Sequence, residues 1–579
     1  MSKHSGDSHK YAPLQNPIGS RIEASGFRNF FKTPRPSQRF HLHGADPMES
    51  EGAAQEVRRL MRKLSLRMDA DIKWSDHGDR EARSWENPNL PSGYTYLLQL
   101  LSHDLVQTSV PVSTLGGWRP QTVNARRTGL ALETIYGGGP VACPFAYVPD
   151  GDRDRSRTKL RLGRIQRDDR TTDRQCPFRD IPRASAESQT TARAAASGRL
   201  SWPDPLIADP RNDDHAILSQ MATLFAFLHN GLVDLVSRRD QGLPGGDVRD
   251  SHHRFLTARA VTSLIYRQVV RNDLMRRLLH PAIYRLYSGD APRFLDGEQV
   301  GDSAAPSQGW SIPLEFSHGV FRFGHSMVRD EYRINEFASN DLVENLQKTS
   351  FTDPANMPLN ESWVVQWSRF FSINDSKPNL SRRIGPSFSS GLNSEQIFPS
   401  IDQSDRVGLA YRDLMSGSLA GLWALQPLIE EIRMRRPELV RASALLDDRE
   451  LRERQIAQWL REGRAFGSLD DDDIEALAKD PPLPFFFLWE AATEPGVHGL
   501  HLGTLGSIIV AEVVFGALAR SPFQEERSLE GRRAALRAMF RTFQSDATLE
   551  DISNVSTMSD FVLLTANLSC LEDAIPAFV

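Results

Sequence analysis

The chain has 579 residues, 40% of them hydrophobic, and a formal net charge of −5. That charge argues against nucleic acid as the main partner. The sequence contains only three cysteines, so neither a disulfide framework nor a four-cysteine metal site is possible. The length allows several domains or one large helical domain.

The first 45 residues are polar and rich in Ser, His, Pro and Gly, which predicts an N-terminal extension over residues 1–45 that is loosely ordered or draped over the body. The opening residues lack the apolar core of a signal peptide, and no apolar run looks long enough to span a bilayer. We therefore expect no membrane span. The protein would be either cytoplasmic or secreted without a cleaved signal peptide, and the residues do not choose between these.

Residues 91–109, PSGYTYLLQLLSHDLVQTS, place their aromatic and leucine side chains at helical spacing. Gln99 and His103 stand four residues apart, so both side chains leave the same face of the predicted helix. This geometry suits a base and a hydrogen-bonding neighbour above one substrate atom. Taken alone, His103 is more often an ordinary histidine on a helix face.

Residues 148–200 are dense in Arg and Asp and lack an apolar stripe, which predicts an arginine-rich surface insertion. Residues 208–239 follow; they begin ADPRNDDH and continue with apolar residues every third or fourth position, as in a long buried helix. Arg211 lies at the head of this helix. By itself it is equally well explained as an ion pair at a helix start.

Residues 313–335, PLEFSHGVFRFGHSMVRDEYRIN, contain the candidate metal ligand. In helical form Arg322 and His325 share one face, and Gly324 leaves room for a large group beside the imidazole. Neutral imidazole is a strong ligand for iron. A lone histidine on an apolar helix is nevertheless more often a core residue.

Together these segments resemble the animal-type haem peroxidases, also called the peroxidase-cyclooxygenase superfamily, and particularly their bacterial members. RFGHSMVR resembles the proximal-histidine helix, residues 91–109 resemble the distal helix over almost their whole length, and DPRNDDH resembles the family's DPRNDEN segment. Residues 407–417, VGLAYRDLMSG, resemble the family's LAxRNLxRG segment. The resemblance covers residues 85–520 in unbroken order.

The resemblance implies a mainly α fold of many helices with long loops and very little β. Residues 46–579 would form one large haem-peroxidase domain, with residues 521–579 as a peripheral C-terminal segment. It further implies haem b as the cofactor, with His325 as the proximal ligand of the haem iron and Arg322 beside it. Asp413 stands where the family has an asparagine that accepts the hydrogen bond of the proximal imidazole. A carboxylate accepts more strongly, so we hypothesise that Asp413 lowers the iron reduction potential.

On the distal side the resemblance makes His103 the catalytic base, Gln99 the distal glutamine and Arg211 the catalytic arginine. Many relatives carry at the position of Ser102 an aspartate that forms an ester with a haem methyl, and a hydroxyl cannot form that link. Asp214 stands where relatives have the glutamate of the other ester. Aspartate is one methylene shorter, so a link through Asp214 stays open.

The same resemblance suggests a calcium site. Asp104 matches the family's calcium-ligating aspartate, and Glu133 matches the second of two aspartates in the calcium loop. The first of those two aspartates is replaced by Ala131. Calcium needs several hard oxygen ligands, so Asp104 and Glu133 are candidate ligands for a site that stays open.

The implied activity is that of a haem peroxidase, which reduces hydrogen peroxide through a ferryl intermediate and oxidises a small reducing substrate. The missing ester and Asp413 both work against a high potential, which favours phenolic donors or easily oxidised halides over chloride. One alternative is a fatty-acid dioxygenase of the cyclooxygenase-like branch, although that branch has a radical-forming tyrosine at the position of Arg322. The other is a non-catalytic haem-binding protein of the same fold. The reducing substrate and the oligomeric state cannot be read from the residues.

Overall fold

The computed structural model describes residues 25–42, 50–69, 84–107, 123–124, 126, 129–149, 156–165, 179–184, 204–239, 248–289, 294, 311–336, 338–348, 359–393, 408–520, 526–540 and 547–569. Within them helices dominate, and the strands form sheets of only two or three short members. The predicted mainly α fold with very little β is confirmed.

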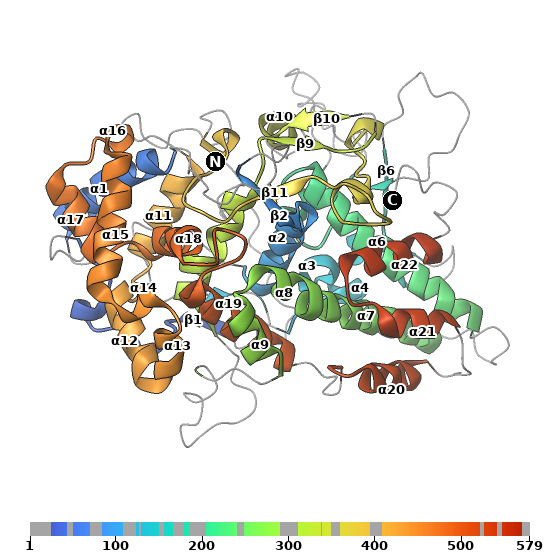
Figure 1. Ribbon diagram of the computed structural model, residues 1–579. Helices are drawn as coiled ribbons and strands as arrows, with labels where there is room; N and C mark the ends of the chain where they lie inside the picture. Colours follow the sequence, from blue (N-terminus) through green and yellow to red (C-terminus); the bar gives the residue numbers. More distant parts are fainter. Residues whose placement is uncertain are drawn as a thin grey trace.

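Three helices pack against one another in series. α2 (Gly93–Leu105) packs against α6 (Ala216–Arg239), and α6 packs along most of α7 (Val248–Val269). In Figure 1, α12 to α17 lie at one end of the molecule, α6, α7 and α20 to α22 lie at the other, and α2 lies between them. The strands beside α2 are β2 (Glu86–Pro91) and β11 (Leu380–Arg382), which pair antiparallel.

The other elements complete the two ends and the surface. The remaining helices are α1 (Glu51–Met68), α3 (Glu133–Tyr136), α4 (Gly139–Ala142), α8 (Met275–Leu278), α9 (Pro281–Gly289), α10 (Leu342–Lys348), α11 (Leu409–Leu419), α12 (Leu425–Arg435), α13 (Pro437–Arg441), α14 (Ala444–Asp447), α15 (Arg449–Glu462), α16 (Arg464–Gly467), α17 (Asp471–Lys479), α18 (Leu483–Thr493), α19 (Thr504–Ala519), α20 (Leu529–Met539), α21 (Ala547–Asn554) and α22 (Met558–Leu568). The remaining strands are β1 (Ser25–Arg28), β3 (Val123–Asn124), β4 (Tyr147–Val148), β5 (Lys159–Leu160), β6 (Gly163–Arg164), β7 (Arg179–Asp180), β8 (Ile312–Pro313), β9 (Glu331–Arg333) and β10 (Ser339–Asp341).

The segment that carries the candidate iron ligand is helical, but it is not an α-helix. A π-helix, η8 (Glu315–Gly319), runs into a 3₁₀ helix, η9 (Val320–Met327), and the backbone of Gly319 leaves the α region at φ −104° and ψ −99°. A 3₁₀ helix has three residues per turn, so side chains three apart align along its axis. The predicted shared face is therefore present in η9, with tighter winding than an α-helix would give.

The N-terminal extension is more ordered than predicted over its described part. β1 pairs with β8 in parallel and with β3 antiparallel, so it joins the sheet next to the proximal segment. Phe30, Phe40 and Leu42 are buried in the main core. The expectation of a loosely ordered extension is wrong for residues 25–42, because their apolar side chains fill the core; residues 1–24 lie outside the described part.

Two other segments also pack more closely than expected. The C-terminal segment is not peripheral, since Phe561 of α22 lies 4.7 Å, ring to ring, from Phe225 of α6. Gly231 of α6 faces Leu568 so closely that a Cβ there would lie 2.8 Å from the leucine side chain. In the arginine-rich insertion, Leu160 and Ile181 are buried in the core, so its described parts are not purely surface.

α6 needs a correction of its own. Among the described residues, Ala216–Arg238 form one helix long and apolar enough to cross a membrane, with mean hydropathy 1.4, although no such run was expected from the sequence. Of its apolar window 89% is buried inside the protein, as in the core helix of a globular domain. The contacts with α2, α7 and α22 account for that burial.

Glu315 links three distant parts of the chain beneath the proximal segment. Its buried carboxylate accepts hydrogen bonds from Asn29 Nδ2 at 2.9 Å, from the backbone N of Phe30 at 2.7 Å and from the backbone N of Trp423 at 3.0 Å. The N-terminal strand and the loop after α11 are thereby fastened to η8.

We predict that Glu315→Ala lowers the free energy of unfolding by about 3 kcal/mol or more, because three buried donors lose their acceptor. Glu315→Gln keeps the volume and one acceptor oxygen, so its free energy of unfolding should lie between those of the parent protein and of Glu315→Ala. Urea unfolding followed by circular dichroism measures the difference. A change of Glu315→Ala below about 0.5 kcal/mol, the usual range for surface substitutions, would contradict the prediction.

Candidate functional site

The proximal candidates converge on one carboxylate. Asp413 of α11 is buried, and its Oδ2 lies 2.6 Å from Nδ1 of His325, while its Oδ1 accepts a hydrogen bond from Nη1 of Arg322 at 2.8 Å. Arg322 also donates to Oγ of Ser416 at 3.0 Å. The 3₁₀ winding of η9 places the side chains of Arg322 and His325 over the same residue of α11.

The contact with Asp413 determines which ring nitrogen of His325 carries the proton. An ionised carboxylate only accepts hydrogen bonds, so Nδ1 carries the proton and Nε2 has the free lone pair. The imidazole is 32% exposed although η9 lies among core elements. A histidine oriented through Nδ1 with Nε2 presented outward is the donor that a haem iron takes.

The proximal and distal elements are in direct contact. A Cβ on Gly324 would lie 3.0 Å from Cδ2 of Leu98, so glycine permits the close approach of η9 to α2. His325 follows Gly324 directly, and His103 is five residues beyond Leu98 on α2. The two candidate histidines thus come from neighbouring elements, as the two sides of a haem site require.

The distal candidate His103 is buried, and its Nδ1 lies 3.1 Å from Oδ1 of Asn212. The amide Nδ2 of Asn212 donates to the carbonyl oxygen of Thr134 at 2.9 Å, which fixes the amide with its oxygen towards His103. Nδ1 of His103 therefore carries the proton and Nε2 is left as the base. Asn212 was not expected as a site residue, although it stands inside the DPRND motif.

The surroundings keep His103 neutral. Burial and the positive charge of Arg211 together lower its pKa to about 3, although the carboxylate of Asp209 acts in the opposite direction. Neutral imidazole is the form that accepts a proton.

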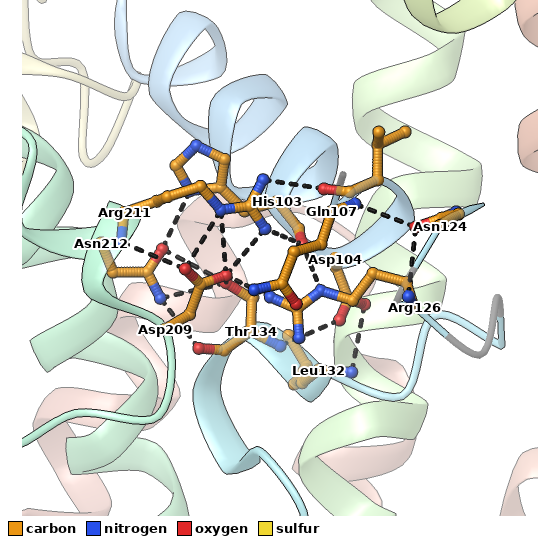
Figure 2. A network of polar contacts seen from close by, with 11 residues as sticks. His103, Asp104, Gln107, Asn124, Arg126, Leu132, Thr134, Asp209, Arg211 and Asn212 are labelled. Carbon is orange, nitrogen blue, oxygen red and sulfur yellow. Dashed lines mark hydrogen bonds and ion pairs between the residues drawn. The ribbon is translucent and has the colours of Figure 1, made fainter. Parts of the chain in front are cut away.

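Arg211 lies behind His103 at the end of α2. Its guanidinium donates to the carbonyl oxygens of His103 at 2.8 Å and Val106 at 2.7 Å, and forms an ion pair with Asp209 at 2.8 Å (Figure 2). Arg126 also donates to the carbonyl of His103, at 2.8 Å, and pairs with Asp209. The ion pair considered as the alternative for Arg211 is thus present, and the two arginines fix the end of the helix that carries His103. A catalytic role for Arg211 stays a prediction.

Gln99 is held by a histidine that the sequence did not single out. Nε2 of His215 lies 3.1 Å from Oε1 of Gln99, and Nδ1 of His215 accepts a weak bond from the backbone N of Leu218 at 3.4 Å. Nε2 therefore donates to the amide oxygen. With its oxygen engaged, Gln99 has its amide nitrogen left as a donor beside His103.

Asp104 holds backbone groups of the predicted calcium loop. Its carboxylate accepts hydrogen bonds from the backbone N of Leu132 at 3.1 Å and of Thr134 at 3.3 Å. Burial is the main cause that raises its pKa to about 6; the charge of Arg126 opposes this rise and that of Glu133 adds to it. Within the described residues no group of three or more His, Cys, Asp or Glu side chains is arranged to hold a metal ion. A calcium ion between Asp104 and Glu133 stays a prediction.

Asp214 is buried. In the chain it lies between Arg211 and His215, just before α6 begins. The predicted ester between Asp214 and haem stays a prediction. Ser102 lies one residue before His103 on α2 and is only partly buried.

The comparison with family models then adds an independent observation. Residues 151–381 match the model of the animal haem peroxidases. Proteins of that family bind haem. The matched range includes Arg211, Asp214, Arg322 and His325; it begins after α2 and stops before Asp413. No curated protein matches the chain in sequence.

Solved structures with the same fold include enzymes of two kinds. Peroxidase A from Dictyostelium discoideum is 12% identical with a TM-score of 0.50, over 98% of this chain and 97% of its own. The fatty acid alpha-dioxygenase of Arabidopsis thaliana is 12% identical with a TM-score of 0.52, over 96% of this chain and 84% of its own. At such low identity these likenesses show that the chain shares the fold of these enzymes, and they do not show its reaction.

A pH dependence follows from the burial of His103. Its pKa of about 3 predicts that a step in which His103 accepts a proton keeps a level rate constant from pH 7 to about pH 4, because the imidazole remains neutral. Arg211→Leu removes a positive charge, so the pKa should rise towards its ordinary value of about 6.5 and the acid limb should move to higher pH. Arg211→Lys keeps the charge and serves as the control. Stopped-flow rates measured across this pH range test the prediction. If the acid limb of Arg211→Leu lies at the same pH as that of the parent protein, the charge of Arg211 does not lower the pKa of His103.

Proposed function

We propose that the protein is a haem-dependent peroxidase, which reduces hydrogen peroxide and oxidises small organic donors or easily oxidised halides. The observation that carries the proposal is the bond between His325 and Asp413, on an element in contact with the helix of His103. This arrangement supplies an oriented iron ligand on one side and a neutral base on the other.

Haem b, held by Nε2 of His325, would supply the iron that binds peroxide and accepts its oxidising equivalents. Asp214 is the candidate for one ester link to it. Asp413 orients His325 and increases its donor strength, while Arg322 withdraws part of the carboxylate charge. The reduction potential would follow the balance of these two contacts.

His103 would move the proton that cleavage of peroxide requires. Its Nε2 would take a proton from one oxygen of hydrogen peroxide and return it to the other oxygen, which then leaves as water. Asn212 keeps the proton of the ring on Nδ1 throughout. The charge of Arg211 keeps the imidazole neutral and favours the negative charge that develops as the O–O bond breaks. The amide nitrogen of Gln99 would donate a hydrogen bond to an oxygen of hydrogen peroxide.

A fatty-acid dioxygenase is the alternative with the same fold, and one of the similar structures bears that name. In that branch a radical-forming tyrosine stands three residues before the proximal histidine. Here the position is Arg322, whose guanidinium is engaged with Asp413 and Ser416. An arginine cannot form that radical, which favours the peroxidase.

The first test is the absorption spectrum of haem-loaded protein mixed with one equivalent of hydrogen peroxide. We expect the Soret band to bleach and shift, and to recover when a phenol or bromide is added. His103→Ala should slow the first step about 10²- to 10⁴-fold. A Soret band that ignores peroxide would leave a non-catalytic haem protein, and oxygen uptake with a fatty acid would instead support the dioxygenase.

A second test measures the iron reduction potential by spectroelectrochemistry. Asp413→Asn weakens the acceptor of the His325 proton and should raise the potential, whereas Arg322→Leu removes the compensating charge and should lower it. Asp413→Leu removes the acceptor altogether and should weaken haem binding about 10- to 100-fold. If Asp413→Asn and Arg322→Leu shift the potential in the same direction, the proposed balance is wrong.

A further inference from the structure

A phenol and an imidazole form a buried pair that the mechanism above does not use. Tyr136, the last residue of α3, and His229 of α6 are both fully buried. The Oη of Tyr136 lies 3.0 Å from Nδ1 of His229, and Nε2 of His229 lies 2.8 Å from the carbonyl oxygen of Thr158. A carbonyl oxygen only accepts, so Nε2 carries the ring proton and Nδ1 has the lone pair. Tyr136 therefore donates its O–H to a base.

Two other buried tyrosines donate to acceptors of other kinds. Tyr147 donates to the carbonyl oxygen of Tyr136 at 2.8 Å, and a carbonyl cannot take the proton at ordinary pH. Tyr94 donates to the carboxylate of Asp273 at 2.6 Å, which also accepts from Arg277 and from the backbone N of Met558. The acceptor of the Tyr136 hydroxyl is thus an imidazole, whereas those of Tyr147 and Tyr94 are a carbonyl and a carboxylate.

Tyr136 is also joined to the distal site. Thr134, two residues earlier in the one-turn helix α3, receives the hydrogen bonds of Asn212, which in turn holds His103 (Figure 2). α3 packs against both α2 and α6. A single turn of helix therefore connects the phenol to the residues around the base.

We propose that Tyr136 is a redox-active residue, which gives one electron to the haem site after that site has been oxidised by hydrogen peroxide. The inference rests on the proposed function, because peroxide supplies the oxidising equivalents. The Oη–H bond breaks, the proton forms a new bond to Nδ1 of His229, and the electron reduces the haem site by one equivalent. An electron from the reducing substrate and the proton from His229 then restore the phenol.

The charges around the pair suit this exchange. Burial raises the pKa of Tyr136 and lowers that of His229 to about 4, so at neutral pH the phenol is protonated and the imidazole neutral before oxidation. The guanidinium carbon of Arg259 lies 5.2 Å from the centre of the phenol ring, and its charge lowers both pKa values. A proton on His229 is therefore held weakly and returns readily to the phenolate when the radical is reduced.

The experiment is freeze-quench electron paramagnetic resonance of haem-loaded protein after one equivalent of hydrogen peroxide, with the haem absorption recorded in the same samples. We expect a tyrosyl radical signal that narrows when the protein contains ring-deuterated tyrosine. Tyr136→Phe should abolish the signal, and Tyr147→Phe, the matched loss of one buried hydroxyl, should keep it. His229→Gln removes the base and should lower the radical yield at least about tenfold.

The outcomes separate the two proposals. If the haem absorption responds to peroxide but the signal survives Tyr136→Phe, the redox role of Tyr136 is overturned and the proposed function stands. If Tyr147→Phe abolishes the signal as well, the loss reflects packing and the assignment to Tyr136 is overturned. If the haem absorption does not respond to peroxide in the parent, the proposed function fails and the role of Tyr136 fails with it.

Discussion

The carboxylate of Asp413 is the group on which the proximal side depends. It accepts the proton of His325 through one oxygen and pairs with Arg322 through the other, so two residues of η9 are fixed by one residue of α11. This requires a close approach of α11 to the rest of the core, and Gly417 provides it, since a Cβ there would lie 2.5 Å from the ring of Pro484. The 3₁₀ winding of η9 is the second requirement, because it aligns side chains three residues apart. Orientation of the ligand and tuning of its donor strength therefore come from the same contact.

On the distal side the corresponding group is Asp209, which pairs with Arg126 and Arg211. Two cations around one buried carboxylate leave a net positive charge near His103, which adds to the effect of burial on its pKa. Both arginines also donate to the carbonyl oxygen of His103, so they occupy an acceptor at the end of α2 that lacks a helical partner. The same cluster thus fixes the position of the base and its protonation state.

The sequence predicted the helical fold, and short motifs with local spacing named the candidate site residues. Gln99 and His103 share a helix face, and His325 and Asp413 were paired only through the family resemblance. Asn212 and His215 were missed as partners, since their roles depend on contacts with α2, more than a hundred residues earlier. The burial of residues 25–42 and of α22 was missed for the same reason, because short apolar stretches become core only when distant segments cover them. The mixed π and 3₁₀ winding could not be read from periodicity, which barely distinguishes a tight helix from an α-helix over so few residues.

The histidines of the site and of the Tyr136 pair follow one rule: an acceptor that cannot donate fixes which ring nitrogen carries the proton. For His103 that acceptor is the amide oxygen of Asn212, for His325 the carboxylate of Asp413, and for His229 the carbonyl of Thr158. The acceptors differ in charge, and the chemistry differs with them. A neutral amide leaves His103 a weak base that can release its proton again, while a carboxylate makes the remaining nitrogen of His325 a strong donor. In the proposed function a single ring type would therefore serve as proton carrier in His103 and as metal ligand in His325, according to the group that accepts its ring proton.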